Sequence, residues 1–321
     1  MAKLVDATGL GPVGRKPLEV RVLSPALAAV ALFAVVTPIA AAPGWRVARP
    51  IPIARTEVSG ARVGSEIVVA GGYLADGTST GRVDAYSPRG DRWRQLPALP
   101  VRLNHAAAAA AEGRLYVAGG YGAERKLFVF AGGAWRRLRD LPVPRAAAAA
   151  AIVDRRLYVV GGVTAPGQLA KRMLVFDLVR GRWSFAAGPT PREHLAAAAS
   201  AGRVFALAGR SGGTNFGYLE AYSPGRRTWR RLPPVPDPRG GTGLAANGGR
   251  LVSVGGEEAA GTIAPVYSYD VGRRSWTRLA DMRTPRHGLA VAAFGARVYA
   301  IAGGPQPGLH VSNANEYLVA R

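Results

Sequence analysis

Six tryptophans stand at nearly even intervals along the chain, and this spacing limits the possible folds more than any other feature of the sequence. They lie at positions 45, 93, 135, 183, 229 and 276, and the chain has no others. A repeat of roughly 45 residues indicates a row of equivalent structural units, none of which can bury a hydrophobic core alone.

Three other residue types recur in phase with the tryptophans. A glycine ends an apolar run 26 or 27 residues after each tryptophan, an aromatic residue precedes each later tryptophan, and an arginine follows each tryptophan by 9 or 10 residues. The glycines are Gly72, Gly120, Gly162, Gly209, Gly256 and Gly303; the aromatics are Tyr86, Phe130, Phe176, Tyr222, Tyr269 and the final Tyr317; the arginines are Arg55, Arg102, Arg145, Arg192, Arg239 and Arg286. Four series in one phase predict six copies of one unit.

Each period contains four short segments with strand character. In the second period these are residues 105–111, 115–120, 127–130 and 135–138, separated by turn residues. Alanine-rich runs such as 106–111 have helix propensity, but they are too short for a stable helix and recur in phase with strands. Innermost strands around an axis need small side chains, so we predict that these runs are strands. Four strands per period is the pattern of a β-propeller blade.

The order arginine, double glycine, tyrosine, tryptophan across residues 45–321 resembles that of kelch-repeat β-propellers. Ala208 and Ala302 depart from it by replacing the first glycine of two pairs. The last repeat lacks a tryptophan strand, and Trp45 has no repeat before it. The resemblance implies an all-β, six-bladed propeller over residues 43–321, with four antiparallel strands per blade and the N-terminal strand completing the last blade.

The first 42 residues have a different character. Residues 1–26 resemble the translation of a tRNA gene, and we interpret them as a non-native extension. Residues 26–42 contain an apolar run followed by small residues, which predicts a signal peptide. An uncleaved membrane anchor is the alternative. We therefore expect an extracytoplasmic protein, or a cytoplasmic one if the true start follows the apolar segment.

The composition excludes several kinds of site and indicates the charge of the partner. The 321 residues include no cysteine, which excludes disulfides, thiolate metal sites and the cysteine-linked radical centre of the copper oxidases that also contain kelch repeats. The formal charge is +22, carried almost wholly by arginine. No nucleic-acid recognition element is present in the sequence, so we predict an acidic small molecule, glycan or protein partner and no specific nucleic acid.

A propeller has a central channel along its axis. The proposed ligand site is the channel mouth, which is the end of that channel surrounded by the connections between second and third strands and by those between blades. The resemblance implies that the six phased arginines bind the ligand there, although they could instead pair within their own blades. Loop residues complete the predicted site: His105, His287, Tyr73, Tyr121 and Arg210. We predict a monomeric, non-catalytic binding protein without a cofactor.

An enzymatic alternative uses the same mouth. All four histidines, including His310, fall in its loops, and Glu193 with His194 are the candidate catalytic residues. The alternative is an isomerase or epimerase of an anionic sugar, similar to the six-bladed sialic acid mutarotases. The histidines lack metal-ligand spacing, so the sequence predicts no metal site.

Overall fold

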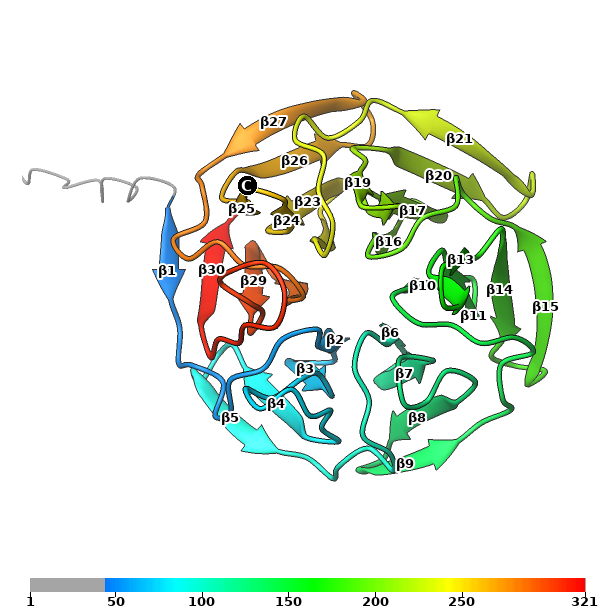
Figure 1. Ribbon diagram of the computed structural model, residues 1–321, viewed down its shortest axis with the longest axis horizontal. Coiled ribbons are helices and arrows are strands. Elements are labelled where there is room, and N and C mark those ends of the chain that lie inside the picture. Colours follow the sequence, from blue (N-terminus) through cyan, green and yellow to red (C-terminus); the bar gives the residue numbers. More distant parts are fainter. Residues whose placement is uncertain (1–43, 321) are drawn as a thin grey trace, which may run out of the picture. The chain divides into compact units, whose positions relative to one another are not determined.

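The structure, a computed structural model, describes residues 44–320, and the predictions for residues 1–26 and 26–42 lie outside them. Six four-stranded antiparallel sheets surround a common axis (Figure 1). The predicted all-β, six-bladed propeller is therefore confirmed. Within the described residues, no helix is long and apolar enough to span a membrane.

The blades are numbered in chain order, and each is listed from its innermost strand outward. Blade 1 contains β2 (Ser59–Val63), β3 (Glu66–Ala70), β4 (Val83–Ser87) and β5 (Arg92–Gln95). Blade 2 contains β6 (Ala107–Ala111), β7 (Arg114–Ala118), β8 (Leu127–Ala131) and β9 (Ala134–Arg137). Blade 3 contains β10 (Ala149–Val153), β11 (Arg156–Val160), β14 (Arg172–Asp177) and β15 (Arg182–Ala187). Blade 4 contains β16 (Ala196–Ser200), β17 (Arg203–Leu207), β20 (Leu219–Ser223) and β21 (Thr228–Leu232). Blade 5 contains β22 (Gly243–Asn247), β23 (Arg250–Val254), β26 (Val266–Asp270) and β27 (Ser275–Leu279). Blade 6 contains β28 (Ala290–Phe294), β29 (Arg297–Ile301), β30 (Asn315–Val319) and β1 (Trp45–Val47).

The second-to-third connections of blades 3, 4 and 5 carry small hairpins that the sequence did not predict. These are β12 (Val163–Ala165) with β13 (Gln168–Leu169), β18 (Arg210–Ser211) with β19 (Thr214–Asn215), and β24 (Glu257–Glu258) with β25 (Gly261–Thr262).

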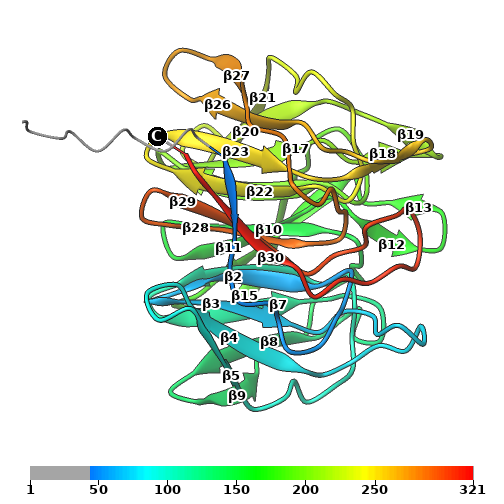
Figure 2. The same ribbon diagram turned by 90° about the vertical axis from the view of Figure 1, so that its left-hand side faces the viewer.

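Strand β1 closes the ring, as predicted. It pairs antiparallel with β30, with Trp45 opposite Leu318 and Val47 opposite Glu316, and Figure 2 shows the two strands side by side. Closure leaves neither terminal blade with an incomplete sheet.

The six tryptophans join neighbouring blades. Each indole Nε1–H donates to a backbone carbonyl that lies four residues after the preceding tryptophan of the ring. The bonds run from Trp45 to Ala280 (3.0 Å), Trp93 to Arg49 (2.8 Å), Trp135 to Pro97 (2.8 Å), Trp183 to Arg139 (3.0 Å), Trp229 to Ala187 (2.7 Å) and Trp276 to Pro233 (2.9 Å). This repeated bond explains the tryptophan period.

The alanine runs form the innermost strands, as predicted. Strands β6, β10 and β16 are built mainly of alanine, and the inner strands of all six blades line one cavity of about 470 Å³. The small side chains allow six strands to approach the axis.

The second glycine of each pair follows the second strand closely. Gly120 has φ of 93°, and a Cβ there would lie 2.6 Å from the carbonyl oxygen of Asn104. The equivalent glycines of the other blades also have positive φ and face a carbonyl in the same way. Only glycine fits this approach, which brings the second-to-third connection against the segment that enters the blade.

Candidate functional site

The channel mouth is built from two adjacent residues just before each inner strand and from the residue that follows the second glycine of each repeat. The second of the two adjacent residues joins a ring of backbone hydrogen bonds around the axis: His105 N donates to Glu57 O, Ala147 N to His105 O, His194 N to Ala147 O, Gly241 N to His194 O, Gly288 N to Gly241 O, and Val58 N to Gly288 O. The first is bridged to the residue after the double glycine: Thr56 to Tyr73, Asn104 to Tyr121, Ala146 to Val163, Glu193 to Arg210, Gly240 to Glu257, and His287 to Gly304. These contacts bring side chains from different blades to the axis.

Five of the six phased arginines do not reach the mouth, which corrects the expected ring of guanidinium groups. Arg55, Arg192, Arg239 and Arg286 are fully buried and Arg145 is 2% exposed. Arg286 illustrates their role: it donates to the carbonyls of Thr284, Ala300, Ala302 and Ala314 and lies 3.1 Å from the Glu316 carboxylate. These side chains tie strands of their own blade together and have no exposed surface to offer a ligand.

Burial also affects the charge of these arginines. It lowers the pKa of Arg55, Arg145 and Arg239 to about 10, so all three stay protonated at neutral pH. Arg55 pairs with Asp84 and Arg192 with Glu220, whereas Arg145 bonds only to carbonyl oxygens.

Arg102 differs from the other five because it does not occupy the equivalent position. In the other blades the buried arginine stands two residues before the residue that joins the backbone ring. In blade 2 the ring residue is His105, so the equivalent position is that of Leu103, which is fully buried. Arg102 precedes it and is exposed. The spacing from tryptophan therefore misassigned the phase of this repeat by one residue.

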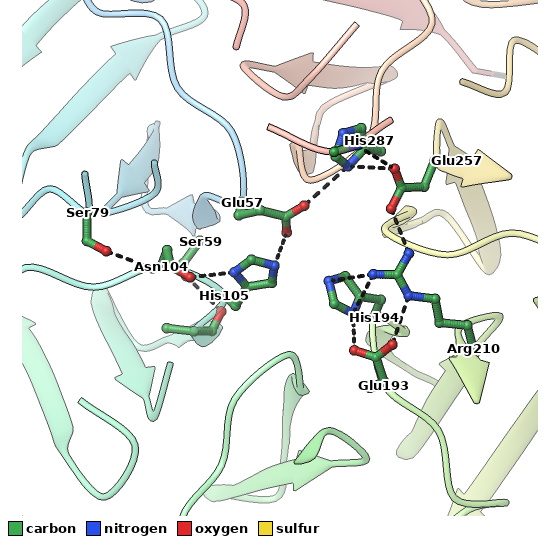
Figure 3. Close-up of polar contacts among 12 residues, drawn as sticks. Glu57, Ser59, Ser79, Asn104, His105, Glu193, His194, Arg210, Glu257 and His287 are labelled. Atoms are coloured by element: carbon green, nitrogen blue, oxygen red, sulfur yellow. Dashed lines mark hydrogen bonds and ion pairs between the residues drawn. The ribbon is translucent and has the colours of Figure 1, made fainter. Parts of the chain in front are cut away.

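The side chains that do meet at the mouth are three glutamates, three histidines and one arginine (Figure 3). Glu57 lies between two histidines: its Oε2 is 3.2 Å from His105 Nε2, and its Oε1 is 3.2 Å from His287 Nδ1. Arg210 lies between two glutamates, donating through Nε to Glu193 and through Nη1 to Glu257, each at 2.8 Å.

His194 connects the two halves of this cluster. It hydrogen-bonds through Nδ1 to Glu193, and its ring centroid is 4.9 Å from that of His105. One donor atom each from Glu57, His105 and His194 lie within 4.8 Å of one another, the spacing of potential metal ligands. We call Glu57, His105, Glu193, His194, Arg210, Glu257 and His287 the mouth cluster.

The mouth cluster is largely shielded from solvent, which changes the pKa of several members. Burial lowers the pKa of His105 to about 4, despite the opposing charges of Glu57 and Glu193. Burial alone would raise the pKa of Glu57, but His105 and His287 lower it overall. Burial alone would lower the pKa of His287, but Glu57 and Glu257 raise it overall. Glu57 therefore carries its negative charge at neutral pH.

The other predicted site residues are placed as follows. Tyr73 and Tyr121 stand edge-on to His105, with ring centroids 5.8 and 5.3 Å away. His310 is exposed in the connection from β29 to β30, and its side chain forms no hydrogen bond or ion pair with the mouth cluster. The mouth encloses a cavity of about 150 Å³, and a second cavity of about 90 Å³ continues below it; Glu57, His105 and His194 line both.

The sequence-based list of binding residues omitted Glu57, Glu257 and Asn104. The signal for Glu257 was present, because it follows the second glycine of its repeat, as the predicted loop residues Tyr73, Tyr121 and Arg210 do in theirs. Glu57 likewise occupies in blade 1 the position of His105 and His194.

A second candidate site, which we call the arginine pocket, lies at the end of the molecule opposite the mouth. It has a volume of about 420 Å³ and is formed by the turn ends of blades 4 and 5. Its lining is Arg203, Ala221, Ser223, Arg226, Thr228, Arg230, Leu232 and Arg274, with no acidic side chain. Within residues 44–320, none of the four guanidinium groups has an ion-pair or hydrogen-bond partner.

One substitution between repeats accounts for an unpaired arginine here. Asp177 and Asp270 end the third strands of blades 3 and 5, and each pairs with an arginine three residues later, Arg180 and Arg273. Blade 4 has Ser223 at that position, so Arg226 lacks the corresponding carboxylate. Unpaired guanidinium groups around a concave surface favour a bound anion.

Comparison with known proteins agrees with the repeat pattern and the fold. The family description "KLHDC2/KLHL20/DRC7 Kelch-repeats domain" matches residues 134–304, more than half of the chain, and "Kelch motif" matches residues 54–100. The protein thus belongs to the class of β-propellers built from repeated four-stranded blades. Within that class, it belongs to the kelch-repeat family, whose propellers typically mediate protein interactions.

Two curated relatives are similar to part of the chain. Kelch repeat and BTB domain-containing protein 12 of Homo sapiens is 38% identical over 94 residues, and its counterpart in Danio rerio is 34% identical over 94 residues. Each alignment covers 25% of this chain and 15% of the relative. The similarity therefore concerns a fraction of the repeats.

Proposed function

We propose that this propeller is a non-catalytic binding protein for an acidic ligand, either a glycan, a peptide or a loop of a protein partner, and that the arginine pocket receives its anionic group. The observation that carries the proposal is the set of four arginines without partners around one pocket that lacks a carboxylate. A carboxylate, phosphate or sulfate group could accept two hydrogen bonds from each guanidinium.

The charge of the mouth argues against placing the acidic ligand there. The mouth cluster holds three glutamates and one arginine, so with neutral histidines its formal charge is −3 + 1 = −2. An anion would meet more carboxylates than guanidinium groups at the mouth but unpaired cations at the arginine pocket.

The test compares two variants with the same change in net charge. Arg226→Gln/Arg274→Gln removes two pocket arginines, whereas the control Arg180→Gln/Arg273→Gln removes two arginines that already face aspartates. Binding of phosphate, sulfate, sialic acid, glucuronate and a glutamate-rich peptide is measured by calorimetry at physiological salt, because nonspecific attraction is screened there. Selective loss in the pocket variant supports the proposal. Equal losses in both variants, or no binding by the unmodified protein, would refute it.

We also propose that the protein acts outside the cytoplasm, on the basis of the apolar segment and small residues at 26–42. Expression of the full chain with a C-terminal tag, followed by fractionation and sequencing of the mature N-terminus, tests this. A new N-terminus near residue 43 in the exported fraction is the expected result. A soluble protein retained in the cytoplasm would contradict it.

A second candidate function is isomerisation of an anionic sugar at the mouth. It is favoured by the contact of His194 with Glu193 and of both with Arg210, beside a cavity of about 150 Å³. The measurement is exchange between anomers of sialic acid followed by NMR, with His194→Gln as the comparison. A rate equal to the spontaneous rate across a panel of acidic sugars would exclude this function.

A further inference from the structure

The mouth cluster contains three imidazoles, each held through one of its two ring nitrogens. Each has one ring nitrogen engaged by a neighbouring acceptor: His105 Nδ1 by Asn104 Oδ1, His194 Nδ1 by the Glu193 carboxylate, and His287 Nε2 by the carbonyl of Gln306 at 3.0 Å. The Asn104 amide nitrogen in turn donates to Ser79 Oγ at 2.7 Å, which fixes the acceptor oxygen towards His105.

In a neutral imidazole, an acceptor on one ring nitrogen places the proton there and leaves a lone pair on the other nitrogen. The lone pair of His105 Nε2 then faces Glu57 Oε2 at 3.2 Å, while His287 Nδ1 lies 3.2 Å from Glu57 Oε1 and 3.6 Å from Glu257 Oε2. His287 is 2% exposed, and its Nδ1 has no hydrogen-bond partner within the described part of the chain. A lone pair and a carboxylate repel each other unless a cation or a proton lies between them.

His194 offers a similar free lone pair. Arg210 Nη2 lies 3.4 Å from Nδ1 and 3.3 Å from Nε2 of His194. A donor lying along the in-plane lone pair of Nε2 would be much farther from Nδ1, so the nearly equal distances place this nitrogen against the face of the ring. The lone pair of Nε2 is therefore not taken by Arg210.

We propose that the mouth cluster is a binding site for one divalent transition-metal ion of the Zn²⁺ type, with Glu57, His105 and His194 as its protein ligands. One carboxylate with two imidazoles is a donor set that such ions prefer. The three donor atoms already lie within 4.8 Å of one another. An ion of charge +2 would also balance the formal charge of −2 that the three glutamates and Arg210 produce.

The surroundings match those of metal-binding histidines in general. Such histidines donate their second ring nitrogen to a carboxylate or an amide or carbonyl oxygen, which orients the ring. Glu193 and Asn104 fill this role for His194 and His105. Since the three ligands line both the mouth cavity and the cavity below it, coordination positions would remain open to small molecules.

The experiment measures metal binding directly. The full-length protein is treated with a chelator, dialysed, and titrated with ZnCl₂ by calorimetry and with CoCl₂ by visible absorption, because cobalt coordinated by protein nitrogen acquires absorption bands that the aqueous ion lacks. We expect one ion per chain. Replacement of a ligand in His105→Gln or His194→Gln should weaken binding by about 100-fold or more, and Asn104→Ala by roughly 10- to 100-fold.

The control is His310→Gln, because His310 is exposed and lies outside the cluster. This variant should bind the ion like the unmodified protein, and near-ultraviolet circular dichroism verifies that each variant is folded. A chelator-treated protein that binds no ion would overturn the proposal. Binding that survives in folded His105→Gln and His194→Gln, or that is lost in His310→Gln, would overturn it as well.

Discussion

The buried pair of Arg192 and Glu220 yields the sharpest prediction about what holds a blade together. Arg192 is fully buried and Glu220 is 6% exposed, and their charged atoms are 2.5 Å apart. Arg192 also donates to the carbonyls of Thr190, Ala206 and Ala208. Substitution by methionine keeps most of the volume but leaves a buried carboxylate without its cation.

The expected loss for Arg192→Met is about 3–5 kcal/mol of unfolding free energy, since removing one partner of a buried ion pair has this cost. Adding Glu220→Gln removes the unpaired charge while retaining an acceptor for Thr190, which donates to Glu220 through its hydroxyl at 2.9 Å. The double variant should therefore recover at least about 1 kcal/mol relative to the sum of the single variants. Blade 2 supports this expectation, because it has Leu103 where Arg192 stands in blade 4.

Urea denaturation followed by tryptophan fluorescence measures these free energies. The matched control is Arg94→Met, which breaks a pair with Glu66 of similar length, 2.6 Å, on an exposed surface. That change should cost less than about 1 kcal/mol. Equal losses for Arg192→Met and Arg94→Met, or strictly additive effects of the Arg192 and Glu220 substitutions, would show that the buried pair does not act as a unit.

Four further predictions concern the contacts that close the propeller, the dependence of stability on acidic pH, and the metal site. Trp135→Phe removes the bond to the Pro97 carbonyl and should lower the unfolding free energy by about 1 kcal/mol in urea denaturation, and an unchanged midpoint would contradict the bridging role. Deletion of residues 44–48 from the full chain exposes the edge of β30, and light scattering should detect aggregation that the intact protein does not show. Hydrogen bonds from the Arg49 amide and the Tyr86 hydroxyl lower the pKa of Asp91. The stability that Asp91 contributes is therefore present above its unfolded pKa, about 3.9, and is lost as the pH falls through its folded pKa. The difference in unfolding free energy between the unmodified protein and Asp91→Ala should therefore be larger at pH 7 than at pH 2. Arg210→Gln removes a positive charge beside the proposed ion and should tighten Zn²⁺ binding in calorimetry, whereas weaker binding would mean that Arg210 organises the ligands.

The periodic residues allowed the fold to be predicted because each of them makes the same kind of contact in every blade. The tryptophans bridge neighbouring blades, and the second glycines leave space for a carbonyl. These contacts repeat along the chain, so four series in phase predicted six repeats. The strand-like segments of each period predicted four strands per blade, and the incomplete last repeat predicted the closing strand. The hairpins of blades 3, 4 and 5 were missed because they occupy connections that vary from blade to blade.

The arginine series was periodic as well, but its role was misread. Regular spacing cannot by itself distinguish a ligand contact from a buried architectural group. The distinguishing signal lies on the third strand, where Asp84, Glu220 and Glu316 stand 28–30 residues after Arg55, Arg192 and Arg286. An arginine matched by an acid at that distance is paired inside its blade, whereas Arg145 and Arg239 are buried without such an acid, so this signal identifies only part of the series.

The mouth cluster could be predicted position by position, but its contacts depend on small residues between the polar ones. His105 and His194 belong to blades 2 and 4, which are not neighbours, and yet their rings meet. Blade 3 contributes Ala147 to the backbone ring between them, and Ala147 has no side chain beyond Cβ. Gly241 and Gly288 likewise separate His194 from Glu57 in the ring. Three small residues therefore let three larger polar ones share the space near the axis, and a bulky side chain at any of these positions would divide the cluster.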